Sequence, residues 1–453
     1  MAGLVSLPRN GRRQIRKGPS GLAACLTAAC ALVSGDAGAT AWIKTNPQVR
    51  IRIVEAGSRS QVRGFDLKFF SYARHSETLG APIRSRKPAA QADRVSAWKI
   101  DCPNGGVVRA TMIAPRPLST RPLMLAGPVL VESPAGFVSV EGRPYREKIL
   151  IHPVKKGSRW ACEFVNHVDI EKYLDGLVNA EFNAKWNPEA IDAQVIAART
   201  YAYYQMRVAR DRKEDIHFDL DSTIRDQVYD GSMREDYRAS LAAERTRGVV
   251  LKASLRDDWP IKAYYHSTCG GTTELPEAVW GKKERGFVHR ATCPYCHESP
   301  SYLWDIPLEA KEVAHQIWVG AKNLAPGEKT TKTWPAGWRK SLREATLVGL
   351  KAVTASPAGR VGKVVTDWKL GDARFSLDVP ATWFRFWVGT TKLKSTVFQI
   401  LPAKNGAFVL RGKGYGHGVG LCQWGAKVAG ERGKTHAQIL KLYYPDAVMA
   451  RAW

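Results

Sequence analysis

The sequence is short of acidic residues, because it has 42 Asp and Glu against 68 Lys and Arg and a formal net charge of +26. This imbalance indicates an anionic partner, which can be nucleic acid, a membrane surface or an acidic cell-wall polymer. Internal repeats and heptads are also lacking. Hydrophobic residues make up 44% of the chain, with 15 Trp and 15 Tyr, which excludes a disordered protein and predicts about two or three globular domains.

Long apolar runs are scarce as well. The run at 21–35, "GLAACLTAACALVSG", is too short to favour a membrane span. Five basic residues precede it, and Ala37 and Ala39 follow in an A-x-A arrangement, which is typical of a secretory signal peptide. We therefore expect a signal peptide at 1–39 and an exported protein in the periplasm, the cell wall or the extracellular space, without an integral span after cleavage. A lipoprotein cleavage at Cys25 is the alternative. Nucleic acid is not a predicted partner, since an exported basic protein meets cell-wall polymer first.

The pattern of elements predicts an α+β fold. We expect a β-rich region of unknown role at 40–135, with a loop near 77–94, and a second domain at 136–450. Asp169 and Asn187-Pro188 are typical N-terminal caps and predict helices at about 169–182 and 188–208. Further predictions are a strand at 383–389, a hairpin turn at Asn405-Gly406 and one or two helices at 421–444.

One carboxylate falls on an apolar helical face. Glu181 follows Leu174, Leu177 and Val178 at spacings of seven, four and three residues. Burial raises the pKa of a carboxyl group, and a protonated acid is what cleavage of a glycosidic bond requires. A single acid of this kind suffices where a hydroxyl of the same sugar replaces the attacking water. The alternative is that Glu181 ends its helix and points to solvent.

Four segments in order resemble the stage II sporulation protein D family, also called the SpoIID/LytB domain. They lie at 173–205 ("YLDGLVNAEFNAKWNPEAIDAQVIAARTYAYYQ"), 221–231, 264–274 and 414–447. The resemblance implies a lytic transglycosylase that cleaves peptidoglycan glycan strands, preferably strands stripped of stem peptides, and forms anhydro-muramyl ends. Other members are amidase enhancers, so a non-catalytic wall-binding protein that assists a cell-wall amidase is the alternative.

The resemblance also implies roles for individual residues. Glu181 takes the position of the catalytic acid/base, and Arg199, Tyr415, His417 and Gln423 take positions that bind substrate. The fixed charge of an arginine suits substrate binding or tuning of the acid. The structural alternatives are an arginine on a helix surface and a histidine that bonds its own loop.

Two close pairs of potential metal ligands lie near 266–297, namely His266 with Cys269 and Cys293 with Cys296. Their spacing predicts a tetrahedral Zn²⁺ site with a structural role, and His297 is an alternative ligand. Zinc beside this segment is also known among members of the family. A disulfide between Cys293 and Cys296 is the competing interpretation, because an exported compartment is oxidising.

The remaining cysteines leave further alternatives open. Cys102 and Cys162 are candidates for a disulfide, and Cys422 would then be a lone thiol. Cys422 and Trp424 replace the Ser and Tyr that are usual in the family. A nucleophilic pair of Cys422 with His417 is a minor hypothesis. A zinc amidase is a further one, but it needs an open metal site, whereas the predicted ligand set is closed.

Overall fold

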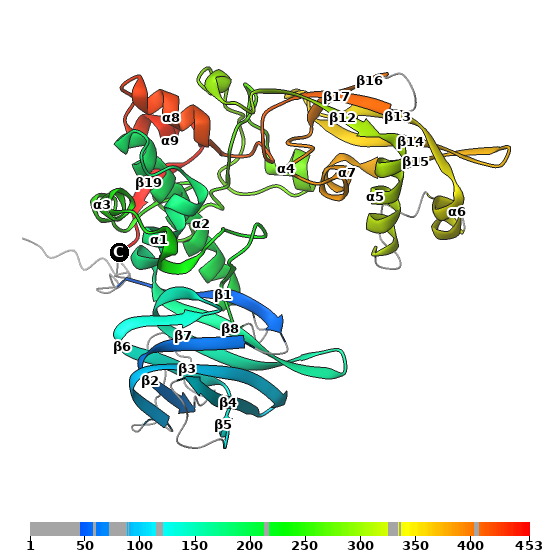
Figure 1. The fold of residues 1–453 in the computed structure, drawn as a ribbon. Helices are drawn as coiled ribbons and strands as arrows, with labels where there is room; N and C mark the ends of the chain where they lie inside the picture. The colour runs from blue at the N-terminus through cyan, green and yellow to red at the C-terminus, as the bar shows by residue number, and fades with distance from the viewer. Residues whose placement is uncertain are drawn as a thin grey trace, which may run out of the picture. The chain divides into compact units, whose positions relative to one another are not determined.

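The computed structural model describes residues 46–57, 60–71, 88, 90–114, 121–212, 217–324, 334, 337–402 and 407–453 (Figure 1). The predicted signal peptide, the possible lipoprotein site at Cys25 and the predicted Asn405-Gly406 turn lie outside these residues. No helix in these ranges is both long and apolar enough to cross a membrane.

The fold is α+β, as the sequence predicted. The strands are β1 (Gln48–Gly57), β2 (Ser60–Ser71), β3 (Ala90–Asn104), β4 (Val107–Ala114), β5 (Leu123–Ala126), β6 (Val129–Val140), β7 (Arg143–Lys156), β8 (Arg159–Asp169), β9 (Leu220–Asp221), β10 (Val249–Lys252), β11 (Tyr265–His266), β12 (Leu303–Glu309), β13 (Thr346–Thr354), β14 (Val361–Leu370), β15 (Ala373–Pro380), β16 (Val397–Pro402), β17 (Ala407–Lys413), β18 (Leu421–Cys422) and β19 (Val448–Arg451). The helices are α1 (Ile170–Glu181), α2 (Pro188–Asp211), α3 (Tyr237–Arg245), α4 (Pro276–Trp280), α5 (Ala310–Lys322), α6 (Trp338–Glu344), α7 (Ala381–Val388), α8 (Gln423–Glu431) and α9 (His436–Tyr443), with 3₁₀ turns at Gly231–Arg234 and Cys296–Glu298.

The first nine strands form one sheet in the order β5-β4-β3-β2-β6-β7-β8-β1-β9. Its pairs are antiparallel except for the short β1–β9 pair. Strand β6 runs across the position 135/136, so hydrogen bonding continues through the place where the sequence suggested a division. Part of the predicted loop at 77–94 belongs to β3, which begins at Ala90.

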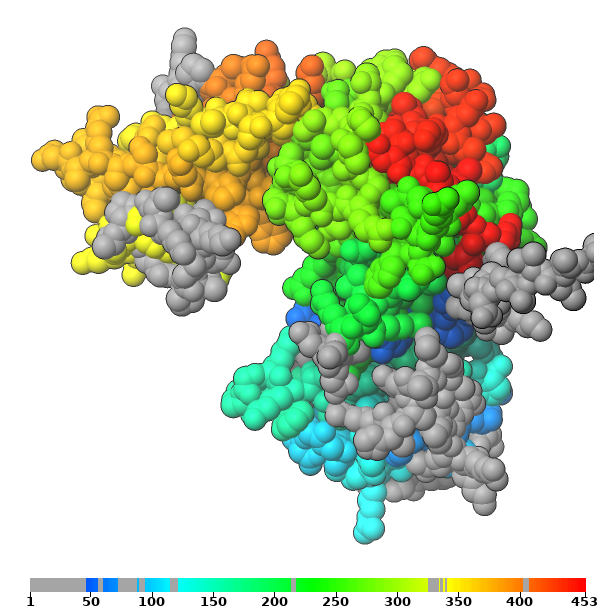
Figure 2. All heavy atoms as spheres, turned by 180° about the vertical axis from the view of Figure 1, so that it is seen from behind, coloured from blue at the N-terminus to red at the C-terminus, as the bar shows by residue number. Residues whose placement is uncertain are grey.

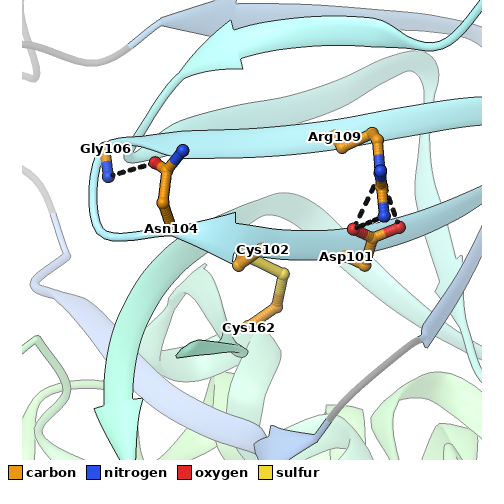
Figure 3. Close-up of a disulfide and its surroundings, with 6 residues drawn as sticks. All are labelled: Asp101, Cys102, Asn104, Gly106, Arg109 and Cys162. Carbon is orange, nitrogen blue, oxygen red and sulfur yellow. Dashed lines mark hydrogen bonds and ion pairs between the residues drawn. A yellow bond between two sulfur atoms is a disulfide. The ribbon is translucent and has the colours of Figure 1, made fainter. Parts of the chain in front are cut away.

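A disulfide joins two strands that are not neighbours in this sheet. Cys102 of β3 and Cys162 of β8 are bonded with their Cα atoms 5.3 Å apart, which confirms that pairing (Figure 3). Because β2, β6 and β7 lie between β3 and β8 in the strand order, the sheet must curl to bring them together. The ion pair of Asp101 with Arg109 stands beside the disulfide on the β3–β4 hairpin.

Helices α1 and α2 follow the sheet directly, and both begin where the sequence predicted. The side chain of Asp169 accepts the N–H of Glu171, and that of Asn187 accepts the N–H of Glu189, so each satisfies a free donor in the first helical turn. The predicted helices near the C-terminus are α8 and α9, and they pack against α2. These helices share one hydrophobic core with the curled sheet (Figure 1).

A second hydrophobic core is built from residues between Trp304 and Leu410. Two three-stranded antiparallel sheets, β12-β17-β16 and β13-β14-β15, and helices α5, α6 and α7 surround it. The first and last strands of this segment pair with each other, so that Leu303 stands opposite Lys413. We call residues 303–413 the inserted module; its residues from about 340 to 400 are drawn yellow to orange in Figure 2.

The predicted strand at 383–389 is wrong, because residues 383–388 lie in helix α7 and Gly389 caps its end. Ala381, Phe384 and Val388 are buried at spacings of three and four residues. This helical period decides the structure against the high strand propensity of the aromatic residues. The change matters for the surface of the module, since it places Trp383, Phe386 and Trp387 on one short helix.

Candidate functional site

Glu181 is the last residue of α1, and it is partly buried. The helix buries Tyr173, Leu174 and Leu177, and the same stripe carries Glu181 to the edge of the core. Its Oε1 accepts the backbone N–H of Val228 at 2.5 Å. Burial raises the pKa of Glu181 above its usual value, and the hydrogen bond from Val228 opposes this shift in part. Glu181 therefore ends its helix without lying free in solvent.

Three tyrosines lie near enough to this carboxyl group for its charge to act on them. Burial raises the pKa of Tyr173, Tyr201 and Tyr265, and the charge of Glu181 contributes to the shift in each case. Gln227 links two of them, because it accepts from Tyr173 Oη at 3.1 Å and donates to Tyr265 Oη at 3.0 Å. The tyrosines thus stay protonated around Glu181 and form an uncharged, largely buried wall.

The nearby carboxylate of Asp226 is already engaged. Its Oδ1 accepts from Tyr201 Oη at 3.0 Å and from Gln205 Nε2 at 2.6 Å, and its Oδ2 accepts the N–H of Asp221. Tethered in this way, Asp226 organises the 221–229 segment that presents Val228 to Glu181.

The Gly-rich segment 414–420 lies beside strand β11. Tyr415, half-buried, exchanges two backbone hydrogen bonds with Thr268. His417 Nδ1 accepts the N–H of Val419, and the backbone of Tyr265 also bonds this ring. Burial holds the pKa of His417 well below its usual value, so the imidazole is neutral. The ring therefore bonds its own loop and the neighbouring strand β11, which agrees with the structural alternative for His417.

A buried arginine from the inserted module supports this loop. Arg360 donates from Nη1 to Thr396 Oγ1 at 3.1 Å, and burial lowers its pKa to about 10. A Cβ at Gly418 would stand 1.7 Å from Arg360 Nη2, and Gly418 has φ +81°. The loop can therefore pass over the guanidinium only because residue 418 is glycine.

Gln423 contacts the main chain of Glu181 and not its carboxyl group. Its Nε2 donates to the main-chain carbonyl of Glu181 at 3.0 Å, and the side chain is 8% exposed. It thereby satisfies one of the carbonyl groups that a helix end leaves free. Gln423 lies in the candidate site as the sequence suggested, but in this structure it positions the end of α1.

Arg199 does not line the site, which corrects its predicted role in substrate binding. The side chain is fully buried and forms a bidentate ion pair with Glu171, with Nη2 2.7 Å from Oε2. It also donates to Thr246 and to the carbonyl groups of Val249 and Ala243. Arg199 therefore joins α1, α2 and the α3–β10 region inside the core.

Four cysteines form a buried cluster. Their Sγ atoms lie within 4.8 Å of one another, and none of the four is in a disulfide; they are Cys269, Cys293, Cys296 and Cys422. Cys269 Sγ is 3.5 Å from Cys296 Sγ, close to the roughly 3.8 Å edge of a tetrahedron with Zn–S bonds of about 2.3 Å. The donor set of four thiols thus fits a closed zinc site.

The fourth member of this cluster corrects the predicted ligand set. His266 is not in the group, because its Nδ1 faces the carbonyl of Val419 at 3.1 Å. Cys422 takes that place, which β18 makes possible by pairing with β11. Cys422 is therefore no lone thiol and no partner of His417, while His297 is exposed and bonds the carbonyl of Pro294.

Sequence reasoning missed three groups at this site, namely the N–H of Val228, the thiol of Cys422 as a ligand and the guanidinium of Arg360. A backbone donor has no sequence signal. Cys422 was visible only as a departure from the usual serine, and Arg360 lies in a segment that matched no motif.

Comparison with known proteins places the core of this site in a family. Residues 158–252 match the family model described as stage II sporulation protein (SpoIID). An uncharacterized protein of Brachyspira hyodysenteriae is 29% identical over 282 residues, which is 62% of this chain and 66% of the relative. The amidase enhancer of Bacillus subtilis is 27% identical over 302 residues, or 61% of this chain and 40% of the relative. The stage II sporulation protein D of Bacillus amyloliquefaciens is 27% identical over 305 residues, which is 64% of this chain and 76% of the relative.

Proposed function

This chain is a member of the SpoIID family, and from that premise we propose that it is a lytic transglycosylase of peptidoglycan glycan strands, with Glu181 as its single acid/base. The names of its relatives, among them an amidase enhancer, support a role related to the cell wall. The observation that carries the proposal is the partly buried carboxyl group of Glu181, whose pKa is raised by burial.

The geometry suggests how one carboxyl group serves both halves of the reaction. Oε1 accepts the N–H of Val228, so the acidic proton belongs on Oε2. Oε2 gives this proton to the glycosidic oxygen as the bond from that oxygen to the anomeric carbon breaks. The carboxylate, stabilised by the Val228 N–H, then removes the proton of a hydroxyl of the same sugar. That oxygen bonds the anomeric carbon, the anhydro ring closes, and Glu181 is again protonated.

Engagement of Asp226 supports this route over a two-carboxylate hydrolysis. A hydrolase needs a second carboxylate as nucleophile or as base for water. Asp226 is held by Tyr201, Gln205 and the backbone of Asp221. The ring-closing mechanism needs no such group, because the base is the conjugate of the acid.

The test is a digest of intact and amidase-stripped peptidoglycan, with products resolved by mass spectrometry. The wild type should make anhydro-muramyl ends, and Glu181→Gln, which keeps an acceptor for Val228, should make none. Glu244→Gln, a change at an exposed position of α3, is the matched control and should cut like the wild type. If wild type and Glu181→Gln both bind the strands and neither cuts them, the enzyme proposal falls and the amidase enhancer takes its place.

We further propose that the four-cysteine cluster holds a structural Zn²⁺ through Cys269, Cys293, Cys296 and Cys422. A closed set of four thiolates leaves no position for water, so the ion would hold the strands β11 and β18 and the 293–296 turn together. Elemental analysis of the purified protein should find one zinc per chain. Cys422→Ser should lower this content, whereas His266→Gln should keep it; the reverse result would restore the ligand set predicted from the sequence.

A further inference from the structure

A groove of about 650 Å³ opens between the inserted module and helix α4, in the size range of about 300–1,000 Å³ that ligand sites occupy. Its walls come from helices α4, α5 and α7. The residues that line it are Trp280, Gln316, Val319, Gly320, Asn323, Leu324, Thr382, Trp383, Phe386 and Trp387. Glu181 is not among them, so this groove is separate from the candidate acid.

Two aromatic rings at this groove are exposed to solvent, and two more are partly buried against the second hydrophobic core. Phe386 is 68% exposed and Trp280 is 45% exposed. Trp383 and Trp387 stand with ring centroids 5.7 Å apart. Aromatic side chains that stay exposed to water add little to the stability of the fold. Several of them gathered in one groove therefore mark a binding surface.

The groove also depends on a close approach that one residue permits. A Cβ at Gly320 of α5 would stand 2.3 Å from the indole of Trp387. The bare helix backbone therefore lets the indole of α7 lie flat against α5. Gln316, Asn323 and Thr382 add hydrogen-bonding groups between the rings. A few polar groups among aromatic walls are typical of a ligand site.

Trp280 connects this groove with the candidate site. It stacks on Tyr264 with ring centroids 4.6 Å apart, and it lies 5.1 Å from His417. Tyr264 in turn meets Tyr201 at 6.0 Å, and Tyr201 is one of the tyrosines whose pKa responds to Glu181. A row of rings therefore leads from the surroundings of Glu181 to the groove.

We propose that this groove binds a run of sugars of the same glycan strand, away from the bond that is cleaved; the inference rests on the proposed function. Pyranose rings present flat C–H faces that stack on aromatic rings, and their hydroxyl and acetamido groups suit amide and hydroxyl partners. The lining residues that the structure describes carry no formal charge. That chemistry fits the C–H faces and the hydroxyl and acetamido groups of the sugar rings.

The test compares binding of short and long peptide-free glycan strands by isothermal titration calorimetry, with Glu181→Gln in every protein to prevent turnover. The unmodified groove should favour long strands. Phe386→Ala and Trp383→Ala should each lower the ratio of long-strand to short-strand affinity about tenfold, since each removes one stacking ring. Phe65→Ala is the matched control, because Phe65 is also an exposed phenylalanine, at 49%, and lies on β2 away from the groove.

Each outcome separates the two proposals. An unchanged ratio in both groove variants overturns the glycan site. Normal strand binding with lost binding of a purified cell-wall amidase also overturns it, and makes the groove a protein docking surface. Because the readout is binding, the test also holds if the wild type cuts no strand in the separate digest, in which case the catalytic proposal alone fails.

Discussion

Replacing Arg199 by methionine tests whether this residue holds the core together or serves the substrate. Its guanidinium donates to both oxygens of Glu171, to Thr246 Oγ1 and to two backbone carbonyl groups. The side chain has no exposed surface, and Glu171 is 8% exposed. Removal of one partner of a buried ion pair leaves the other charge unpaired and costs about 3–5 kcal/mol. We expect Arg199→Met to lower the free energy of unfolding by that amount.

The measurement is urea denaturation at neutral pH, with a fit that checks for an unchanged m value. The double variant Glu171→Gln/Arg199→Met should recover part of the loss, because the unpaired carboxylate is gone. Strand affinity, measured on folded protein, should stay at the wild-type level. A loss of stability below about 1 kcal/mol, as for an exposed ion pair, together with weakened strand binding would refute this reasoning and return Arg199 to the substrate.

Two further predictions concern pH and the disulfide. The pKa of Glu181 is raised in the folded chain, so as pH rises the unfolded chain loses this proton before the folded chain does. The free energy of unfolding therefore falls between the usual pKa of 4.5 and the higher pKa of the folded chain. Glu181→Gln should remove this fall in denaturation curves recorded across pH, and cleavage by the wild type should decline as pH passes the raised value. The disulfide of Cys102 with Cys162 closes a loop over a separation of 60 residues, which lowers the conformational entropy of the unfolded chain. Cys102→Ala/Cys162→Ala should therefore lower the free energy of unfolding by about 4 kcal/mol. A loss below about 1 kcal/mol in urea denaturation would contradict this explanation.

Local signals in the sequence predicted the helices that carry the site. Asp169 and Asn187 begin α1 and α2 as capping residues, and the apolar stripe of α1 located Glu181 at the edge of the core. These features depend on residues a few positions apart. For that reason they are legible in the chain without knowledge of the fold.

Contacts between distant segments were not legible in the same way. The burial of Arg199 depends on Glu171 and on the α3–β10 region, and nothing in the local pattern of α2 marks it. Cys422 joins the cysteine cluster because β18 pairs with β11, and this pairing has no local signal in the sequence. The spacing of residues along the chain therefore predicted His266, which is nearer to Cys269, as the fourth ligand. In α7 the aromatic residues have strand propensity, and only packing of Phe384 and Val388 in the second core decides for helix.

The pairing of Leu303 with Lys413 has an evolutionary consequence. Paired residues of neighbouring antiparallel strands lie roughly 5 Å apart, so the chain enters and leaves the inserted module at nearly one point. A segment with its own hydrophobic core and adjacent ends can be gained, lost or exchanged between genes without rethreading the rest of the polypeptide. The sequence of such a segment can then change while the helices around Glu181 keep their places.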